Sequence, residues 1–370
     1  MKNKQCSVYL IGASPAEKFY SMEVYGKALA RNLRQQSGVE VKVHQWSASK
    51  TLKIDDWRGV RAVRTYWNRF IRSPRELNIP VADVYHILDH SYAHLITTLP
   101  ARRTVITCHD LMPLLLPDYR ATLGGWLQVM VFKYTISSLL QATYIISISE
   151  FTKRCLRDIL KIEDSKISVI PLGVEEIFLK YEKSIRPTFK KSEEKIILQV
   201  GVTQEAYKNV FNILKAFRKL VESMGDKVRL LKVGKPYTPE QQVYINSVGL
   251  KKQIEYLGYV EREKLPEIYG QADLLLMPSL FEGFGLPILE AMACGTPVVT
   301  SRRGSIPEVA SEAAFYVEPE KPEGIAEGVK KVLFEQELRA KLIKAGEKQA
   351  QKFTWEKTAE KTLKVYKKIE

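Results

Sequence analysis

The sequence predicts an α/β protein built from two Rossmann-like, doubly wound parallel-sheet domains. Its 370 residues are long for one hydrophobic core, so two domains of about 170 to 180 residues each are the natural division. Short apolar runs typical of buried strands alternate with helical patterns through both halves of the chain. This alternation favours two parallel sheets that face one another across a cleft.

We expect the first domain to span residues 1–180 and the second to span residues 181–353, with a last helix over residues 354–370. The boundary is predicted from the charged, proline-bearing run Tyr181 to Lys195, which has the composition of a linker. No fixed-period repeat and no low-complexity tract interrupts this division.

The composition is that of a globular protein, with 45% hydrophobic and 27% charged residues. Most of the net charge of +15 lies in residues 1–170, which hold 24 Lys and Arg against 14 Asp and Glu. A basic excess attracts nucleic acid, anionic lipid or diphosphate carriers, and it also serves solubility alone. The cysteines are scattered without a Cys-x-x-Cys pair, which favours a reducing cytoplasm; they are Cys6, Cys108, Cys155 and Cys294.

No segment of the sequence is apolar over the length of a membrane span. Cys6 to Ile11 is short and lacks a cleavage site, so we expect a first strand there and no signal peptide. Lys133 divides the apolar region Ala121 to Ser149 into runs below the roughly 20 residues needed to cross a bilayer. Trp57 to Ile71 reads as a basic amphipathic helix, which is either a helix for anionic membrane surfaces or an ordinary helix with an arginine-rich outer face.

Three histidines, His86, His90 and His94, recur at a spacing of four residues. On one helix this spacing places at least two imidazoles on the same face, as in a zinc site. Asp83 to Leu88 reads as a strand, however, and no cysteine accompanies the histidines. We therefore expect loop histidines that line a cleft, and no metal site.

His109 follows the buried strand Thr104 to Cys108. Doubly wound folds place their chemistry at the carboxyl ends of strands, so His109 is our candidate for a residue that faces a substrate. A purely structural histidine is the other interpretation. Asp110 then either orients His109 or caps the next turn, while Ser149 has the chemistry of a helix N-cap.

The second domain opens with the strand Ile196 to Val200 and Gly201. Lys208 then begins an amphipathic helix whose apolar face we assign to Phe211, Leu214, Phe217 and Leu220. The runs Val228 to Val233 and Ile254 to Leu257 predict two further strands.

The stretch from Ser279 to Val299 concentrates the chemistry of the chain. A glycine-bearing loop leads there into a helix, with Pro287 suited to its first position and Gly295 to the position after its last turn. Four backbone amides are expected to lack partners and to face an anion at the helix N-terminus, namely those of Gly283, Phe284, Gly285 and Leu286.

Two carboxylates, Glu282 and Glu290, flank these amides. An anion between two groups that accept hydrogen bonds from hydroxyls suggests a nucleotide sugar. An ordinary connection between strand and helix, with both carboxylates in solvent, is the alternative that the spacing alone leaves open.

The same stretch resembles the Glu-x7-Glu motif of the retaining, GT-B-fold nucleotide-sugar glycosyltransferases of family 4. Further segments match that family in order and together cover most of the C-terminal half: Leu257-Gly258-Tyr259-Val260, Leu265 to Tyr269, Ala272-Asp273, Gly304 to Val309 and Phe353 to Glu356. His109-Asp110-Leu111 resembles the active-site histidine motif of the family. Ser21-Met22 stands where members usually carry a Gly-Gly pair near the donor phosphates.

The resemblance implies a role for each matching residue. Glu282 would hold the sugar hydroxyls, Glu290 would accept from the ribose, and Lys208 would neutralise the diphosphate. Tyr259 and Val260 would lie beside the base and Gly201 in the donor site, while His109 would face the transferred sugar. On the acceptor side the implied residues are Ser21, Met22, His90 and Asp110. The last helix would complete the first domain. Near Lys208 the chain departs from the pattern, because Val202 and Tyr207 stand where other members often have arginine.

The resemblance implies a retaining, metal-independent hexosyltransferase, cytoplasmic and without a cofactor. Its donor would be a nucleoside diphosphate sugar, with a UDP-sugar such as UDP-glucose favoured over GDP-mannose, and its acceptor a polysaccharide or lipid-linked saccharide. Metal independence agrees with the lack of an Asp-x-Asp sequence. Two alternatives are a nucleotide-sugar epimerase and a basic protein that binds membranes or nucleic acid. We expect no nucleic-acid partner, because no RNA-binding module is recognisable, whereas peripheral contact with an anionic membrane is expected if the Trp57 to Ile71 helix binds lipid.

Overall fold

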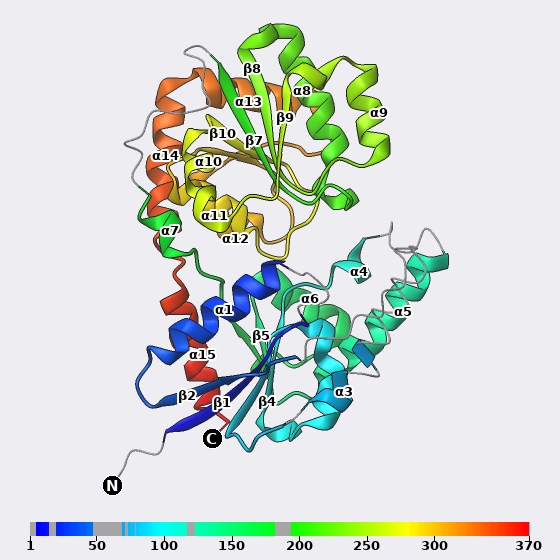
Figure 1. Ribbon diagram of the computed structural model, residues 1–370, viewed down its shortest axis with the longest axis vertical. Coiled ribbons are helices and arrows are strands. Elements are labelled where there is room, and N and C mark those ends of the chain that lie inside the picture. Colours follow the sequence, from blue (N-terminus) through cyan, green and yellow to red (C-terminus); the bar gives the residue numbers. More distant parts are fainter. Residues whose placement is uncertain are drawn as a thin grey trace. The chain divides into compact units, whose positions relative to one another are not determined.

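Two parallel sheets, each of six strands, organise the chain. The computed structural model describes residues 5–14, 20–46, 69–70, 73–77, 79–116, 123–181 and 194–369 (Figure 1). The chain divides into unit 1, which comprises Met1–Gly173 and Trp355–Glu370, and unit 2, which comprises Val174–Thr354. The sequence-based division lay at residues 180 and 181. Most of the expected helix from Trp57 to Ile71 and most of the expected linker from Tyr181 to Lys195 lie outside the described residues.

Unit 1 contains a parallel sheet with the strand order β2-β1-β3-β4-β5-β6. Its strands are apolar and mostly buried because helices cover parallel sheets on both faces. They are β1 (Cys6–Ile11), β2 (Val39–Val43), β3 (Val84–Ile87), β4 (Thr104–Cys108), β5 (Tyr144–Ser147) and β6 (Ile167–Val169).

The helices of unit 1 other than α15 lie between its strands along the chain, as expected for crossover connections in a parallel sheet. The α-helices are α1 (Tyr20–Arg34), α3 (Ser73–Glu76), α4 (Met112–Leu115), α5 (Leu123–Ser137), α6 (Glu150–Leu160) and α15 (Trp355–Tyr366). The 3-10 helices are η3 (His90–Thr98), η4 (Ala101–Arg103), η6 (Ser138–Gln141) and η7 (Asp164–Lys166). Ser149 caps α6 as predicted, because its side chain accepts a hydrogen bond from the Thr152 amide.

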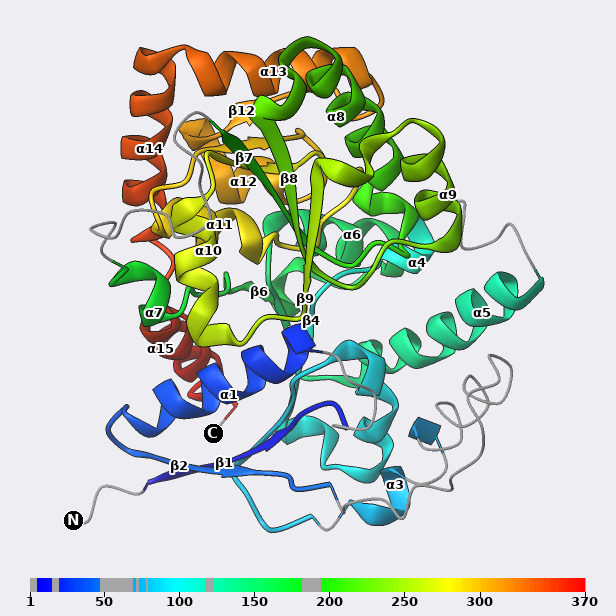
Figure 2. The same ribbon diagram turned by 45° about the horizontal axis from the view of Figure 1, so that its top comes forward.

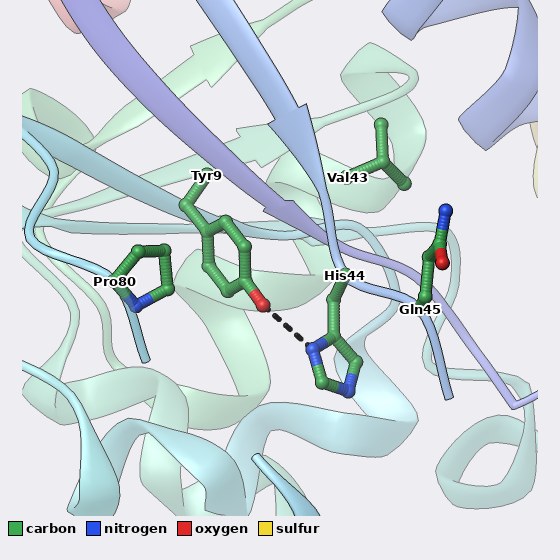
Figure 3. Close-up of a pocket in the computed structure, with 5 residues that line it drawn as sticks. All are labelled: Tyr9, Val43, His44, Gln45 and Pro80. Carbon is green, nitrogen blue, oxygen red and sulfur yellow. Dashed lines mark hydrogen bonds between the residues drawn. The ribbon is translucent and has the colours of Figure 1, made fainter. Parts of the chain in front are cut away.

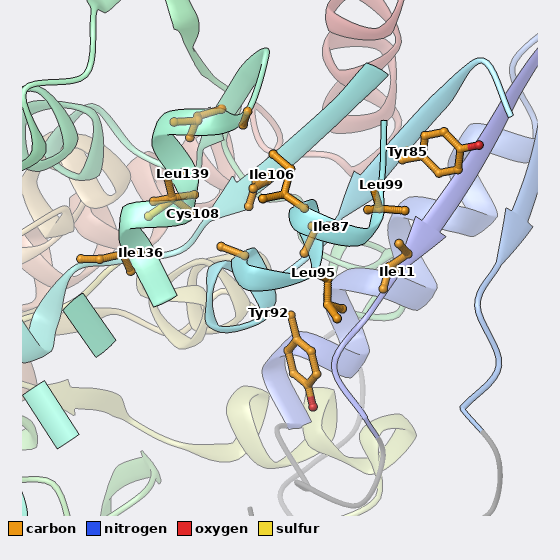
Figure 4. Close-up of a cluster of buried hydrophobic side chains, with 14 of the residues drawn as sticks. Ile11, Tyr85, Ile87, Tyr92, Leu95, Leu99, Ile106, Cys108, Ile136 and Leu139 are labelled. Carbon is orange, nitrogen blue, oxygen red and sulfur yellow. The ribbon is translucent and has the colours of Figure 1, made fainter. Parts of the chain in front are cut away.

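One core of unit 1 lies between the sheet and the helices η3, α5 and η6. Ile11, Ile87 and Ile106 contribute from neighbouring strands, and Leu95 and Ile136 pack against them from the helices (Figure 4). The core fixes the carboxyl ends of β3 and β4, which are followed by His90 at the start of η3 and by His109.

The C-terminal helix α15 packs against α1 within unit 1 (Figure 1). A buried polar chain joins it to the sheet: Tyr366 Oη hydrogen-bonds His86 Nδ1 at 2.6 Å, and His86 Nε2 hydrogen-bonds Thr107 Oγ1 at 2.7 Å. Tyr25 of α1 completes the chain with an Oη to Thr107 Oγ1 distance of 2.9 Å. Because buried polar groups are costly without partners, this series of hydrogen bonds fixes the position of α15 within unit 1.

Unit 2 contains a second parallel sheet, with the strand order β12-β11-β10-β7-β8-β9. Its strands are β7 (Lys195–Gly201), β8 (Val228–Gly234), β9 (Ile254–Gly258), β10 (Leu274–Met277), β11 (Val298–Thr300) and β12 (Phe315–Tyr316). Strands β7, β8 and β9 run outward in one direction, and β10 returns to the other side of β7. The strand order therefore reverses between the paired strands β7 and β10, which is the topological switch point of the sheet. Open α/β sheets bind ligands at the carboxyl ends of the strands at this point.

Helices α8 and α13 lie side by side over one face of this sheet (Figure 2). The α-helices of unit 2 are α7 (Glu176–Leu179), α8 (Val210–Met224), α9 (Pro239–Ser247), α10 (Leu265–Gln271), α11 (Leu286–Ala293), α12 (Ile306–Ala310), α13 (Pro322–Phe334) and α14 (Gln336–Ala350). The 3-10 helices are η8 (Ala206–Lys208), η9 (Gly225–Lys227), η10 (Leu250–Lys252), η11 (Arg262–Lys264) and η12 (Ser311–Ala313).

Two sequence-based assignments in unit 2 were wrong. Phe211 is 41% exposed, because it lies one position away from the buried stripe of Val210, Leu214 and Phe217. Pro287 occupies the second position of α11 and not the first, because the helix already begins at Leu286. Gly295 does follow the last turn, with a φ of 67°.

Candidate functional site

Lys208 and Glu282 meet at the switch point of unit 2. Lys208 ends η8, which follows β7, and Glu282 lies in the loop after β10. The Lys208 Nζ contacts both oxygens of Glu282, Oε1 at 2.7 Å and Oε2 at 2.9 Å. The backbone of the two loops is also joined, since the Leu280 amide donates to the Tyr207 carbonyl at 2.7 Å. The ammonium additionally lies 5.2 Å from the centroid of the Tyr207 ring.

The N-terminus of α11 presents open backbone amides beside this ion pair. Gly285 is its N-cap with a φ of 97°, a left-handed conformation that favours glycine. Among the described residues, no acceptor binds the four amides named in the sequence analysis, those of Gly283, Phe284, Gly285 and Leu286. The amides and the helix dipole together make a site for an anion.

The backbone of Glu282 is held by the segment after β11. Ser305 donates to the Glu282 carbonyl through its amide at 3.2 Å and its hydroxyl at 3.0 Å. Gly304 has a φ of 60°, and a Cβ at this position would lie 2.6 Å from the same carbonyl oxygen. Only glycine fits so close, which gives the Gly304 to Val309 segment a physical role at the site.

Glu290 is buried in α11 and both of its oxygens are occupied. Arg262 of η11 donates to Oε1 at 2.5 Å, and the Tyr269 hydroxyl of α10 donates to Oε2 at 2.7 Å. Arg262 also donates to Glu175 at 2.5 Å and lies 4.6 Å from the centroid of the Phe178 ring. Burial would lower the pKa of Arg262, but the two carboxylates outweigh it and raise the pKa.

Sequence reasoning did not find Arg262 as a partner of Glu290. The residues stand 28 positions apart, and Glu175 is 87 positions from Arg262. The signal that was present is an arginine directly after the Gly258-Tyr259-Val260-Glu261 loop. The structure shows that it reaches the second carboxylate of the motif.

The other donor-side candidates lie at the carboxyl ends of neighbouring strands. Gly201 ends β7 with a φ of 117°, and Gly258 ends β9 with a φ of 70°. Tyr259 follows β9 and is 73% exposed, whereas Val260 is half-buried. The structure thus places Gly201, Tyr259 and Val260 at the same edge of the sheet as Lys208.

His109 of unit 1 directly follows β4 and is buried. Its Nε2 lies 2.8 Å from the Leu88 carbonyl, which can only accept, so Nε2 carries a hydrogen. Burial lowers the pKa of His109, although Asp89 opposes this effect. The neutral ring therefore leaves Nδ1 as a lone-pair acceptor, and this buried atom has no partner among the described residues.

The structure brings His90 to His109, because the His109 amide donates to His90 Nδ1 at 3.3 Å. Asp110 Oδ1 accepts from the Met112 amide at 3.0 Å, so Asp110 caps the turn that begins α4. Ser21 and Met22 lie in the first turn of α1, where Ser21 is exposed and Met22 half-buried.

The three evenly spaced histidines do not share one helix. His86 lies in β3, whereas His90 and His94 lie in η3. His86 bonds Tyr366 and Thr107, and His94 Nε2 bonds the Arg69 carbonyl at 2.8 Å. Across the described ranges, no three His, Cys, Asp or Glu side chains are grouped to hold a metal ion.

A hollow of about 320 Å³ opens in unit 1 beside Tyr9, Val43, His44, Gln45 and Pro80 (Figure 3). Tyr9 Oη and His44 Nδ1 hydrogen-bond at 2.7 Å across it. None of the candidate residues lines this hollow, so we do not assign it to the candidate site. In the part of the chain that the structure describes, we find no helix with the length and apolar character of a membrane span.

Two family models match the chain. One, described as glycosyl transferases group 1, covers residues 180–349, and the other, described as glycosyltransferase family 4, covers residues 22–176. O-antigen chain mannosyltransferase B of Escherichia coli is 30% identical over 277 residues, which are 73% of this chain and 72% of the relative. An uncharacterized glycosyltransferase of Methanocaldococcus jannaschii is 30% identical over 62% of this chain, and the match spans only 61% of that relative's length.

Solved structures share the fold over nearly the whole chain. A sucrose-phosphate synthase from Thermosynechococcus elongatus has a TM-score of 0.72 at 20% identity and covers 99% of both chains. A protein from Anabaena, solved in complex with UDP and glucose, has a TM-score of 0.71 at 16% identity, with 98% of this chain and 100% of that chain covered. These likenesses agree with a two-domain, Rossmann-like GT-B fold.

Proposed function

The chain belongs to the family 4 glycosyltransferases, and we propose that it transfers a hexosyl group from a nucleoside diphosphate sugar to a saccharide or lipid-linked saccharide acceptor. The observation that carries the proposal is the Lys208–Glu282 ion pair beside the open amides of α11. A cation, a carboxylate and amides without acceptors among the described residues, supplied by the segments that follow β7 and β10, match the diphosphate and the sugar of such a donor.

In the proposed donor complex, the Lys208–Glu282 ion pair is broken. The diphosphate binds the amides of α11, and Lys208 turns from Glu282 toward the phosphate oxygens. Glu282 is then free to accept hydrogen bonds from the sugar hydroxyls. Its negative charge also stabilises the positive charge that develops on the ring as the bond to the phosphate breaks.

The proposed reaction retains the configuration of the sugar. The bond between the anomeric carbon and the phosphate oxygen breaks, and its electron pair leaves with the diphosphate. The acceptor hydroxyl attacks from the same face, its oxygen bonds to the anomeric carbon, and its proton passes to the departing phosphate oxygen. No protein nucleophile is needed in this sequence of events.

Two donors are candidates. A UDP-sugar such as UDP-glucose is the donor expected from the family resemblance of the sequence. The 30% identical Escherichia coli relative is named a mannosyltransferase, as is a 28% identical relative from Salmonella typhimurium, and these names favour a mannosyl donor for this chain. UDP-glucose and GDP-mannose are therefore the two donors to compare first.

A thermal-shift screen with these donors tests the proposal. A ligand at 100 times its Kd stabilises a protein by about 2.7 kcal/mol, so a true donor will raise the Tm measurably. We expect one of the two nucleotide sugars to raise the Tm. With a saccharide acceptor, the same nucleotide sugar should give a product that carries one additional hexosyl residue in the anomeric configuration of the donor. Release of a free epimer without acceptor, or no stabilisation by any nucleotide sugar, would contradict the proposal.

The transfer is proposed to need no divalent metal. Lys208 and the α11 amides supply the positive potential for the leaving diphosphate, and the sequence has no Asp-x-Asp. We expect the initial rate to be unchanged by excess EDTA in a radiolabelled transfer assay. A rate abolished by EDTA and restored by Mg²⁺ or Mn²⁺ would show that the diphosphate site is wrongly assigned.

A further inference from the structure

Lys232 is a charged residue buried within strand β8 of the unit 2 sheet. It lies on β8 between Gln199 of β7 and Tyr256 of β9, and its relative exposure is 0%. Lysine is almost never fully buried without a partner. Among the described residues, no carboxylate forms an ion pair with it. Its role is therefore unlike that of the solvated lysines on the surface.

The ammonium of Lys232 reaches the carboxyl edge of the sheet. Its Nζ donates to the Gly201 carbonyl at 2.7 Å and to the Val233 carbonyl at 2.5 Å. Gly201 is the last residue of β7 and Val233 is the second-last residue of β8, and the loop after β7 carries Lys208. Two of the three ammonium hydrogens are used, and the third has no acceptor in the described part of the chain.

The two strand ends that Lys232 joins are in unusually close contact. Gly234 has a φ of 105°, and a Cβ on this residue would lie 2.5 Å from the Gly201 carbonyl oxygen. Any larger side chain would push the strand ends apart. The position of Gly201, a candidate donor-binding residue, therefore depends on both Gly234 and Lys232.

The surroundings of Lys232 leave its charge uncompensated. Gln199 and Tyr256 flank it, and Tyr237 bonds Gln199 through its hydroxyl at 2.9 Å. The charged side chains Lys215, Arg218 and Glu222 of α8 and Glu240 of α9 are exposed, and so is Lys235 after β8. Burial lowers the pKa of Lys232 to about 8. A buried cation without a counter-ion is costly, so a counter-ion that arrives with a ligand relieves the cost.

We propose that Lys232 is a positioning residue for the donor, whose buried ammonium fixes the Gly201 carbonyl and adds positive potential beneath the bound diphosphate. This inference rests on the proposed function, because the counter-ion is the diphosphate of the nucleotide sugar. Lys232 would thus be a third source of positive potential at the donor site, after Lys208 and the α11 amides. Unlike Lys208, it is a residue of a sheet strand.

The proposal predicts a pH dependence of nucleotide affinity. An anion near Lys232 raises the pKa of the ammonium in the complex above its value in the free protein. Nucleoside diphosphate binding is therefore strongest below pH 8, where Lys232 of the free protein is already protonated. The affinity weakens as the pH rises through 8. The decline reaches at most tenfold per pH unit between the free and bound pKa values.

The test is calorimetric titration of UDP and GDP into the wild type, Lys232→Met and Lys232→Arg between pH 7 and pH 9. Methionine keeps much of the side-chain length without charge, and arginine keeps the charge throughout this range. At pH 7 we expect Lys232→Met to weaken the nucleoside diphosphate about tenfold while leaving the parent nucleoside unchanged. Titration of the ligand itself is common to all three proteins, so the differences between their profiles isolate Lys232.

The expected dependence of nucleotide affinity on pH differs between the three proteins. Wild-type affinity should fall above pH 8 toward that of Lys232→Met, and Lys232→Arg should not show this fall. Lys344→Met, which removes an exposed lysine of α14, is the matched control and should behave as the wild type. If Lys232→Met does not fold, the comparison of wild type with Lys232→Arg decides in its place.

Identical pH profiles for the wild type and the folded charge variants, or an equal loss of nucleoside affinity in Lys232→Met, would overturn the inference and leave a lysine that only joins two strands. Wild-type protein that binds neither UDP nor GDP would instead contradict the proposed function, and with it this inference. The two failures are thus distinguishable by the wild-type titration alone.

Discussion

At the scale of single residues, His109 is the candidate whose chemistry is most sharply defined. The Leu88 carbonyl fixes the hydrogen on Nε2, and the lowered pKa keeps the ring neutral, so Nδ1 is an acceptor of known identity. The edge-to-face contact with Tyr25, at 5.0 Å between ring centroids, limits rotation of the imidazole.

His109→Ala should lower kcat by about 100-fold or more and leave the Kd of the nucleotide unchanged, as expected for a residue that acts in the transition state. Steady-state transfer assays and calorimetric titration measure the two quantities. The tryptophan fluorescence of the variant must match that of the wild type, since His109 is also buried in unit 1. An unchanged kcat in a folded variant would assign His109 a structural role.

Single residues also show where sequence reasoning ends. The strand-end position of His109 was predictable, because an apolar run followed by a polar loop is a local signal. The Arg262–Glu290 and Lys208–Glu282 pairs were not, since each joins segments far apart in the sequence that only the folded unit brings together. Lys232 escaped notice because the strand Val228 to Val233 was identified from its apolar residues, and its two cations, Arg229 and Lys232, were not considered separately.

At the scale of secondary-structure elements, a buried hydrogen bond between Tyr366 and His86 helps to hold α15 on unit 1. The Tyr366 hydroxyl and His86 Nδ1 are both inaccessible to water, so removal of the hydroxyl leaves His86 without that partner. Tyr366→Phe should lower the free energy of unfolding of unit 1 by about 1–3 kcal/mol. Urea titration followed by tryptophan fluorescence measures the change.

The matched control for this prediction is Tyr134→Phe on α5. Its side chain is 68% exposed, so loss of its hydroxyl should change stability by less than about 0.5 kcal/mol. Equal effects of the two substitutions would show that the His86 contact does not hold α15 in place.

Elements were predicted well where their pattern is local. The runs that become β1, β4, β7 and β8 are apolar and bounded by glycine or polar residues, and the structure has strands there. The helix register was less certain, since Phe211 was assigned to the apolar face of α8 although its side chain is 41% exposed. Helix starts depend on caps, which explains why α11 begins one residue before Pro287.

At the scale of the whole molecule, the two units differ in what they contain. All five histidines and all five tryptophans lie in unit 1, and the rest of the chain has neither. Burial lowers the pKa of His86 to about 3 and that of His94 to about 4. An unfolded histidine has a pKa of about 6.5, so the unfolded chain binds more protons than the native unit below this pH.

Unit 1 should therefore lose stability as the pH falls from 6.5 toward 4. The stability is fully present above the unfolded pKa and is lost as the pH falls through the range down to the folded pKa. His86 and His94 each contribute a loss of at most about 2 kcal/mol between pH 7 and pH 5. Urea midpoints from tryptophan fluorescence at pH 7, 6 and 5 measure this loss, and a constant midpoint would contradict the burial of neutral histidines.

The central claim concerns the polarity of the site in unit 2, where Glu290 is assigned to the ribose and Glu282 to the sugar. Calorimetric titration of UDP and GDP against Glu282→Gln and Glu290→Gln tests it most directly. Glu290→Gln should weaken the bound nucleotide by about 1–3 kcal/mol, because glutamine keeps only one of the two oxygens that can accept from Arg262, from Tyr269 and from the ribose hydroxyls of UDP and GDP. Glu282→Gln should leave nucleotide affinity equal or tighter, since Lys208 loses a competing partner, and should strongly lower transfer. An equal loss of nucleotide affinity in both variants would contradict the assignment.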